Sequence, residues 1–352
     1  MFIAGVGTAA PPQRYGQKQC WETLQQSKRF DLLEPRAQAL LRKVLNGNNG
    51  IATRHLALEN LGEAFDLSPD TLHGRFAEHA PVLAAQAGQR ALTRAGLQPG
   101  EMDAVIISTC TGYLCPGLTS YVCERLGLRA DVLSLDLVGQ GCGAALPNLR
   151  AAEALLAAGR AQRVLSICVE VCSAAMYLDN DPGVLVSACL FGDGAGAAVL
   201  TSDHPHTRGL KWKAGGSWLE PGKRDCLRFE QKAGLLRNIL RPQVPALAAQ
   251  FARLVLERIL ERAQVKREQV SSWVLHPGGR DVLGALRQEL SLSESDVRWS
   301  EAVLREYGNV SSSSLFFVLE TALADSAPKG YWWMTSFGAG FSCHGALLEM
   351  EV

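Results

Sequence analysis

A cysteine in a glycine-rich turn is the first residue in this chain with evident chemical potential. Cys142 lies in VGQGCGAALPNLRAAEALLAAG, where a predicted strand ends, Gly139, Gly141 and Gly143 turn the chain, and a helix begins. Free N–H groups and the helix dipole at such a position favour an anion, and they lower the pKa of a thiol. We therefore predict that Cys142 is a nucleophile. The alternative is a buried structural cysteine.

Two further polar residues lie at turns that follow predicted strands or begin predicted helices. His276 ends a buried strand and precedes Pro277, Gly278 and Gly279, and the strand ends of an α/β sheet are where ligands bind. Asn309 lies in the turn YGNVSSSS before a helix. Their alternative roles are a satisfied core histidine and a helix N-cap.

The order of predicted elements repeats at an offset of 167 residues. Glu101 matches Glu268, and Cys142 matches Asn309. Two copies are too few for a solenoid, so we expect two halves packed as a pseudo-symmetric pair. Such packing brings a thiol and an amide together at two helix starts, with His276 before the second turn. Cysteine, histidine and asparagine form a known acyl-transfer arrangement.

The elements that position these residues alternate between helices and buried strands, which predicts an α/β fold. The predicted elements of the first half are helices within 17–45, at 81–96, up to 128 and at 143–158, and strands at 103–110, 131–138 and 163–171. Those of the second half are helices at 246–263, at 280–290 and up to 324, and strands at 270–276, near Val297 and at 331–337. We place the halves at residues 1–206 and 207–352.

Composition narrows the possible classes of protein. The chain has 352 residues, of which 35 are Lys or Arg and 35 are Asp or Glu, so bulk electrostatic binding of nucleic acid is disfavoured. The sequence contains no run of 18 apolar residues, so we expect no transmembrane span, and the N-terminus lacks the features of a secretory signal. The ten cysteines include no CxxC pair, so we expect reduced thiols in the cytoplasm and no metal site.

Four longer motifs identify a family resemblance. They are GCGAALPNLRAAEALLAAG around Cys142, LFGDGAGAA at 190–198, WVLHPGGRDVL around His276 and EYGNVSSSS around Asn309. Over nearly its whole length the chain resembles a type III polyketide synthase, of the chalcone-synthase-like family in the thiolase superfamily. The resemblance implies a thiolase-like, five-layered αβαβα fold, a homodimer, and decarboxylative condensation of coenzyme A thioesters.

The resemblance also implies roles for the three polar residues. Cys142 would take a starter acyl group and hold the growing polyketide. His276 would pair with the thiolate and, together with Asn309, donate hydrogen bonds to the malonyl thioester carbonyl and stabilise its enolate. The coenzyme A thioesters would be substrates, namely acyl-CoA and malonyl-CoA, and no separate cofactor is implied.

Other positions match residues around the family's cavity. Phe191 and Phe229 fall where the family has two gatekeeper phenylalanines between the coenzyme A tunnel and the cavity, and core packing is their alternative role. Cys115 matches a residue that reaches across the dimer. The positions that match cavity-lining residues are Cys172, Ala174 and Ala175.

Two parts of the sequence depart from the family's pattern. The C-terminal loop reads FGAG at 337–340 where plant members have FGPG, and alanine leaves the backbone less fixed than proline. The basic residues for the coenzyme A phosphates do not align cleanly. Their candidates here are Arg42, Lys43 and Arg54.

The stretch DCLRFEQKAGLLRNIL and the small cavity residues resemble enzymes that make alkylresorcinols or alkylpyrones. This resemblance implies a medium- or long-chain fatty acyl starter. One alternative is a ketoacyl-acyl-carrier-protein synthase III that performs a single condensation, although that group carries an HQAN-like sequence where this chain has HPGG at 276–279. Another is a non-catalytic acyl-CoA-binding or thiol-sensing protein on the same scaffold.

Overall fold

A computed structural model describes residues 1–204, 209–325 and 328–350 of the chain. The strands of its central sheet are β1 (Phe2–Ala9), β4 (Ala104–Ser108), β5 (Leu133–Leu137), β6 (Arg163–Glu170), β7 (Gly194–Thr201), β8 (Leu210–Leu219), β11 (Val270–Leu275), β12 (Gly330–Gly338) and β13 (Ser342–Met350). Two small antiparallel pairs lie outside it, β2 (Arg14–Gly16) with β3 (Thr53–His55) and β9 (Leu227–Lys232) with β10 (Leu235–Leu240).

The central sheet consists of two related halves joined along one strand pair. Its order is β11-β12-β13-β8-β1-β7-β6-β4-β5. The strands of the second half therefore lie on one side of the β1–β8 contact, and those of the first half lie on the other. In that contact Phe2 faces Lys211 and Ile3 faces Leu210, antiparallel. The parallel pair β4–β6 corresponds to the parallel pair β11–β12, and β6 and β12 begin 167 residues apart. The predicted repeat is therefore present in the fold, whereas the predicted boundary at 206/207 lies outside the described residues.

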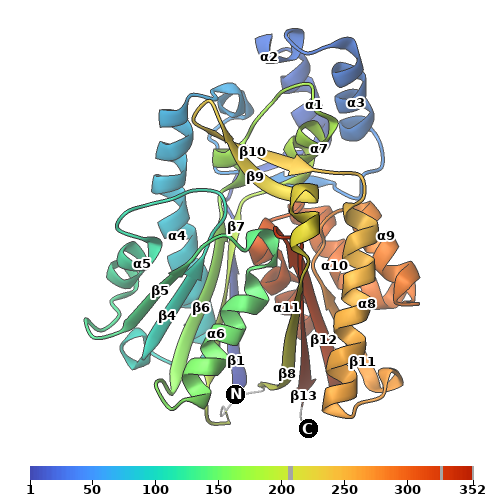
Figure 1. Cartoon of the computed structure of the whole chain (residues 1–352). Coiled ribbons are helices and arrows are strands. Elements are labelled where there is room, and N and C mark those ends of the chain that lie inside the picture. Colours follow the sequence, from blue (N-terminus) through green and yellow to red (C-terminus); the bar gives the residue numbers. More distant parts are fainter. Residues whose placement is uncertain (205–208, 326–327, 351–352) are drawn as a thin grey trace.

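The helices form the other layers of the molecule. They are α1 (Gln17–Gln25), α2 (Lys28–Asp31), α3 (Pro35–Asn46), α4 (Pro69–Ala95), α5 (Leu118–Leu126), α6 (Ala145–Ala157), α7 (Pro182–Leu190), α8 (Val244–Ala263), α9 (Arg280–Glu289), α10 (Glu294–Tyr307) and α11 (Ser314–Ala324). Helices α4 and α5 cover one outer face, and α8 with α9 covers the other (Figure 1). Between them, α6 and α11 contact strands of both halves. This is the predicted αβαβα arrangement.

The strand predicted near Val297 is wrong, because this residue lies inside α10. Val297, Ser300 and Val303 or Leu304 are buried at helical spacing, and the Ser293 hydroxyl caps the helix by accepting a hydrogen bond from the Asp296 N–H. Within the described residues, the second half accordingly has no strand equivalent to the edge strand β5 of the first half.

Helix α4 is longer than the sequence predicted. It begins at Pro69, after the N-cap Ser68, whereas the predicted helix began at residue 81. Pro81 lies inside the helix rather than at its start. The helix packs closely on β1, because a Cβ added at Gly7 would come within 2.4 Å of the Ala91 nitrogen.

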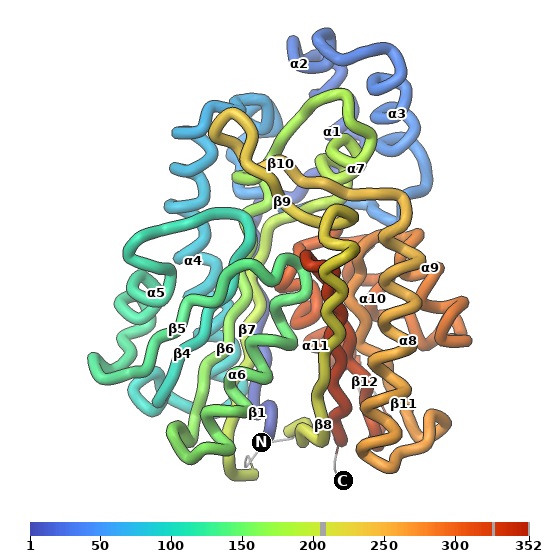
Figure 2. The backbone as a smooth tube through the Cα atoms, in the orientation of Figure 1, coloured from blue at the N-terminus to red at the C-terminus, as the bar shows by residue number. Residues whose placement is uncertain are grey.

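One end of the molecule carries elements that belong to neither sheet half. Helices α1 to α3, helix α7 and the β9–β10 hairpin gather there, opposite the chain termini (Figure 2). Helix α7 contacts both α3 and β10. No helix in the described part of the chain is long and apolar enough to span a membrane.

Candidate active site

Cys142 lies in a short 3-10 turn, η3 (Gly141–Gly143), between β5 and α6. The FGAG loop packs directly on this turn: a Cβ added at Gly338 would come within 2.5 Å of the Gly143 nitrogen. Gly141 has a φ of +55°, a left-handed conformation that glycine adopts without strain. The close contact between these two loops fixes the position of the cysteine at the seam of the two halves.

The Cys142 thiol is protonated in the free protein. Burial raises its pKa to about 12, although the Ser311 hydroxyl donates a hydrogen bond to Sγ at 3.2 Å. The pKa predicted from the helix start was therefore wrong in direction. Helix α6 begins only at Ala145, three residues later, and the effect of burial outweighs that of the turn.

His276 follows β11 directly, as predicted, and is 1% exposed. Its backbone N–H donates to the Thr335 carbonyl, while its Nδ1 has no hydrogen-bond partner in the described structure. The Phe337 ring contacts the imidazole edge-on, with 5.0 Å between the ring centroids. Burial lowers the pKa of His276 to about 3, so the imidazole is neutral at pH 7. No hydrogen bond joins it to Cys142 among the described residues.

The orientation of the Asn309 side chain is fixed from both ends of its amide. Oδ1 accepts a hydrogen bond from the Ser311 N–H at 2.9 Å, and Nδ2 donates to the Gly278 carbonyl at 3.2 Å. One amide hydrogen is therefore left for a ligand. The Asn309 backbone also bridges to Phe191, because the Asn309 carbonyl accepts from the Gly192 N–H and the Asn309 N–H donates to the Leu190 carbonyl.

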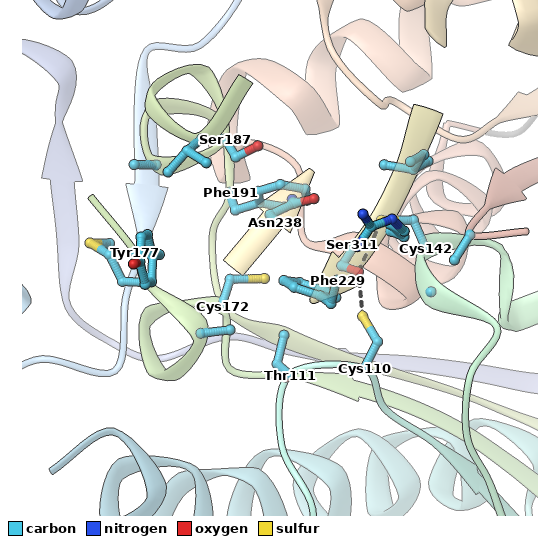
Figure 3. Close-up of a pocket in the computed structure, with 18 residues that line it drawn as sticks. Cys110, Thr111, Cys142, Cys172, Tyr177, Ser187, Phe191, Phe229, Asn238 and Ser311 are labelled. Carbon is cyan, nitrogen blue, oxygen red and sulfur yellow. Dashed lines mark hydrogen bonds between the residues drawn. The ribbon is translucent and has the colours of Figure 1, made fainter. Parts of the chain in front are cut away.

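Two cavities meet at Cys142. The larger has a volume of about 720 Å³ and is lined by Cys142, His276 and Asn309, among others. The inner cavity has a volume of about 50 Å³. Cys142, Phe191 and Leu227 line both. Figure 3 shows Cys142 at one side of the inner cavity and Tyr177 at the other.

The predicted cavity residues separate into groups. Phe191 lies at the junction of the two cavities, whereas Phe229 lines only the inner one, where it faces Asn238 across the β9–β10 hairpin. Cys172 and Ala175 also line the inner cavity. Ala174 does not: it is 7% exposed and packs in the hydrophobic core beneath α4.

Cys115 lies away from both cavities and is exposed at the surface. It belongs to the loop between β4 and α5. The end of this loop lies against β5, because a Cβ added at Gly117 would come within 2.3 Å of an Asp136 carboxylate oxygen.

A buried carboxyl group was missed by the sequence analysis. Glu170 ends β6, is fully buried, and has a pKa raised by that burial. It accepts hydrogen bonds from the Cys110 N–H at 3.0 Å and the Thr111 hydroxyl at 2.9 Å, and also from the Ser312 hydroxyl. A charged residue at the end of the apolar run VLSICVEV was the signal that could have indicated it.

Ser311 links this carboxyl group to the Cys142 thiol. Its hydroxyl lies 3.4 Å from a Glu170 oxygen and 3.2 Å from Cys142 Sγ. Cys110 Sγ lies 3.4 Å from the same hydroxyl, and Figure 3 marks this contact. The thiol of Cys142 is therefore connected to a buried acid through a single hydroxyl group.

Of the three predicted basic residues, only Lys43 lines the larger cavity. Arg42 stacks over Trp21, with its guanidinium carbon 5.6 Å from the ring centroid. Arg54 is 4% exposed and donates to the Ala188 and Phe191 carbonyls at 2.7 and 2.9 Å, so its guanidinium supports the backbone. Arg241 and Arg280, which the sequence analysis did not single out, line the larger cavity with Lys43.

Comparison with known families assigns the chain. Residues 9–214 match the family described as FAE1/Type III polyketide synthase-like protein, and residues 229–349 match the C-terminal domain of chalcone and stilbene synthases. The chain belongs to the type III polyketide synthase family. This type III polyketide synthase is thus an acyltransferase that condenses coenzyme A thioesters, and assignment to the ketoacyl-acyl-carrier-protein synthase III group is set aside.

Individual relatives support the assignment over almost the full length. The chain is 30% identical to a 3,5-dihydroxyphenylacetyl-CoA synthase of Amycolatopsis balhimycina and to a 1,3,6,8-tetrahydroxynaphthalene synthase of Streptomyces peucetius subsp. caesius, in each case over 99% of this chain and 92% of the relative. It is 26% identical to the α-pyrone synthesis polyketide synthase-like Pks18 of Mycobacterium tuberculosis, over 99% of this chain and 91% of the relative.

Solved structures confirm the fold of this type III polyketide synthase. The 1,3,6,8-tetrahydroxynaphthalene synthase of Streptomyces coelicolor A3(2) superposes with a TM-score of 0.90 at 22% identity, with both chains covered completely. PKS-I of the brown alga Ectocarpus siliculosus gives a TM-score of 0.88 at 26% identity, over 99% of this chain and 98% of that one.

All ten cysteines of the synthase are free thiols.

Proposed function

We propose that Cys142 carries the acyl chain and that His276 and Asn309 promote decarboxylation of malonyl-CoA. One observation carries this proposal: Cys142 lies where the two cavities meet, whereas His276 and Asn309 line only the larger one. A coenzyme A thioester that enters the larger cavity would bring its carbonyl to both donors. The chain on Cys142 would extend into the inner cavity.

The bond changes follow from these positions. The Cys142 sulfur attacks the thioester carbonyl of acyl-CoA, its proton passes to the His276 imidazole, and coenzyme A leaves with that proton. Malonyl-CoA then loses CO2, and the electron pair of the broken C–C bond moves into the thioester as an enolate. Hydrogen bonds from neutral His276 and from Asn309 Nδ2 stabilise the enolate oxygen. The enolate carbon attacks the acyl carbon on Cys142, the C–S bond to Cys142 breaks, and the extended chain is left as a coenzyme A thioester. The same thioester exchange returns the extended chain to Cys142 before the next condensation.

Burial explains why a neutral histidine suits this step. A neutral imidazole has one N–H group that can donate a hydrogen bond to the enolate oxygen, and Asn309 donates without titrating. Because burial lowers the pKa of His276 to about 3, the imidazole is neutral at physiological pH whenever it is not holding the proton taken from Cys142. Uncharged donors in a site with little water stabilise a developing oxyanion more strongly than they would in bulk solvent.

The coenzyme A phosphates require a local cationic patch, because the chain has no net charge. Lys43, Arg241 and Arg280 line the larger cavity together with Asp181 and Asp281, and Arg241 lies 3.9 Å from the Asp181 carboxylate. Arg280 also pairs with Asp281 at 3.0 Å, where both side chains are more than half exposed. We assign the phosphates to these three cations rather than to Arg42 or Arg54.

The starter group is the finer part of the proposal. The sequence predicts a medium- or long-chain fatty acyl starter and an alkylresorcinol or alkylpyrone product. The inner cavity of about 50 Å³ is small beside the larger cavity of about 720 Å³, so a long chain requires the inner cavity to open. Its size favours a short acyl starter, and the relatives named for small polyhydroxylated aromatic products agree with this.

A panel of starters tests the assignment. The synthase is incubated with acyl-CoAs from acetyl to palmitoyl, with and without malonyl-CoA, and both the acyl adduct on the protein and the released products are analysed by mass spectrometry. We expect an adduct on Cys142 and resorcinol or pyrone products, with short starters preferred. Folded protein that acquires no adduct and forms no product from any starter contradicts the proposal. Preference for palmitoyl-CoA supports the fatty starter instead.

We also propose that the synthase is a homodimer. Three large apolar side chains are exposed in this part of the first half: Leu133 begins the edge strand β5, Val138 directly follows it, and Tyr113 lies in the loop between β4 and α5. Cys115 lies two residues from Tyr113 in the same loop, whose end at Gly117 packs against Asp136 of β5. A second copy that covers this surface would bury the apolar side chains and place Cys115 in the interface.

A further inference from the structure

The inner cavity contains one buried polar side chain that makes no hydrogen bond. Among its lining residues, the hydroxyl- or amide-bearing side chains that are more than nine-tenths buried are those of Thr111, Ser187, Asn238 and Ser311. The Thr111 hydroxyl donates to Glu170, that of Ser187 to the Gly183 carbonyl at 2.8 Å, and that of Ser311 to Cys142. The Asn238 amide has no hydrogen-bond partner in the described part of the chain.

The position of Asn238 explains why its amide faces the cavity. Successive side chains of a strand point to opposite faces. Arg237, the preceding residue of β10, forms ion pairs outside the cavity with Asp179 at 2.8 Å and Glu230 at 2.9 Å. Asn238 is 8% exposed and lies opposite Phe229 in the hairpin. Figure 3 shows it beside Phe191, with its amide group in the cavity.

The hairpin itself does not require an amide at this position. Its register is set by six consecutive backbone pairs from Leu235–Lys232 to Leu240–Leu227. In the described part of the chain no protein group pairs with the amide, and its atoms remain accessible from the cavity. Leucine, with the same number of side-chain heavy atoms, would fill the same space but could not hydrogen-bond an occupant of the cavity. The unpaired amide is therefore available to a ligand with oxygen atoms.

We propose that Asn238 is a specificity-determining residue that hydrogen-bonds a carbonyl or enol oxygen of the poly-β-keto chain carried by Cys142. Its Nδ2 donates to a carbonyl, and its Oδ1 accepts from an enol hydroxyl. An acyl chain without oxygen atoms gains nothing from this contact, whereas each condensation adds a carbonyl. The contact holds the extended chain for further condensation instead of early release. This inference rests on the proposed function.

Substitution at position 238 tests the contact. N238L removes both hydrogen-bonding groups and keeps the number of side-chain heavy atoms, and Q231L, at an exposed position of the same hairpin, is the matched control. Products of the full-length protein are quantified by mass spectrometry relative to the CO2 released from malonyl-CoA. We expect N238L to lower the ratio of fully extended to truncated products at least fivefold, and Q231L to leave the ratio as in the wild type.

A second pair of variants separates hydrogen bonding from cavity shape. N238T and N238V have side chains of nearly equal size, and only threonine retains a hydroxyl. We expect N238T to give a higher ratio of extended to truncated products than N238V, with equal melting temperatures. Equal ratios in this pair, or an N238L ratio equal to that of the wild type, overturn the inference. Wild-type protein that releases no CO2 from malonyl-CoA overturns the proposed function as well, so the two failures are distinguishable.

Discussion

Cys142 and His276 are both uncharged in the free protein, and this determines how the nucleophile responds to pH. Burial raises the pKa of the thiol to about 12 and lowers that of the imidazole to about 3. A thiolate–imidazolium pair would instead combine a low thiol pKa with a raised histidine pKa. We therefore expect Cys142 to lose its proton only as it attacks the acyl substrate.

Alkylation of the free protein with iodoacetamide measures this directly. Between pH 7 and pH 10 we expect the rate at Cys142 to rise about tenfold per pH unit without a plateau, because the thiolate fraction grows in that proportion below the pKa. The adduct is located by peptide mass spectrometry, which separates Cys142 from the exposed Cys115. A rate that is already constant above pH 6 would falsify the neutral-pair description.

At the scale of elements, close contacts between backbones hold the fold together. Helix α4 lies directly on β1 at Gly5 and Gly7, where added Cβ atoms would come within 2.3 and 2.4 Å of backbone atoms of Ala91. Helix α4 and β1 also belong to one buried hydrophobic core. A side chain at either glycine would push the helix away from the sheet.

The substitution G7A tests this packing. We expect it to lower the free energy of unfolding by about 1–3 kcal/mol, as overpacking of a close contact does. The control is G74A in helix α4, where no atom lies within 4 Å of the added Cβ. It should be neutral or stabilising, because alanine favours the helix more than glycine does. Urea denaturation of both variants measures the difference, and equal stabilities would show that the β1–α4 contact tolerates a methyl group.

Much of the fold and part of the site could be predicted from the sequence. Cys142, His276 and Asn309 lie at the ends or starts of elements with regular patterns, so their positions followed from those patterns. Glu170 was missed because its partners Cys110, Thr111 and Ser312 come from distant segments that only the fold brings together. Burial decides pKa values, cavity volume and the unpaired amide of Asn238, and single-sequence patterns do not report burial at that detail.

At the scale of the whole molecule, the exposed apolar surface at β5 is the feature that a second copy would cover. Val138 is 65% exposed and lies just after β5, whereas Leu32 is 75% exposed at the distant end that carries α1 to α3 (Figure 1). Leu133, at the other end of β5, and Tyr113, in the loop between β4 and α5, are further large apolar side chains exposed in this half of the sheet.

Light scattering after size-exclusion chromatography tests this surface. We expect the wild type and L32E to elute as dimers and V138E to elute as a monomer, because a charge buried in the interface has no partner there. Circular dichroism confirms that V138E is folded. A monomeric wild type, or a V138E variant that remains dimeric, would place the interface elsewhere or remove it.

The central claim is that Asn309 and His276 stabilise the enolate formed from malonyl-CoA, and CO2 release measures it most directly. N309D keeps the oxygen that accepts the Ser311 N–H but loses the amide donor, and N180D makes the same change at an exposed position. We predict that N309D releases CO2 about 10²–10³ times more slowly than the wild type, as expected for loss of one oxyanion donor, while N180D matches the wild type. CO2 release by N309D at the wild-type rate would contradict the account.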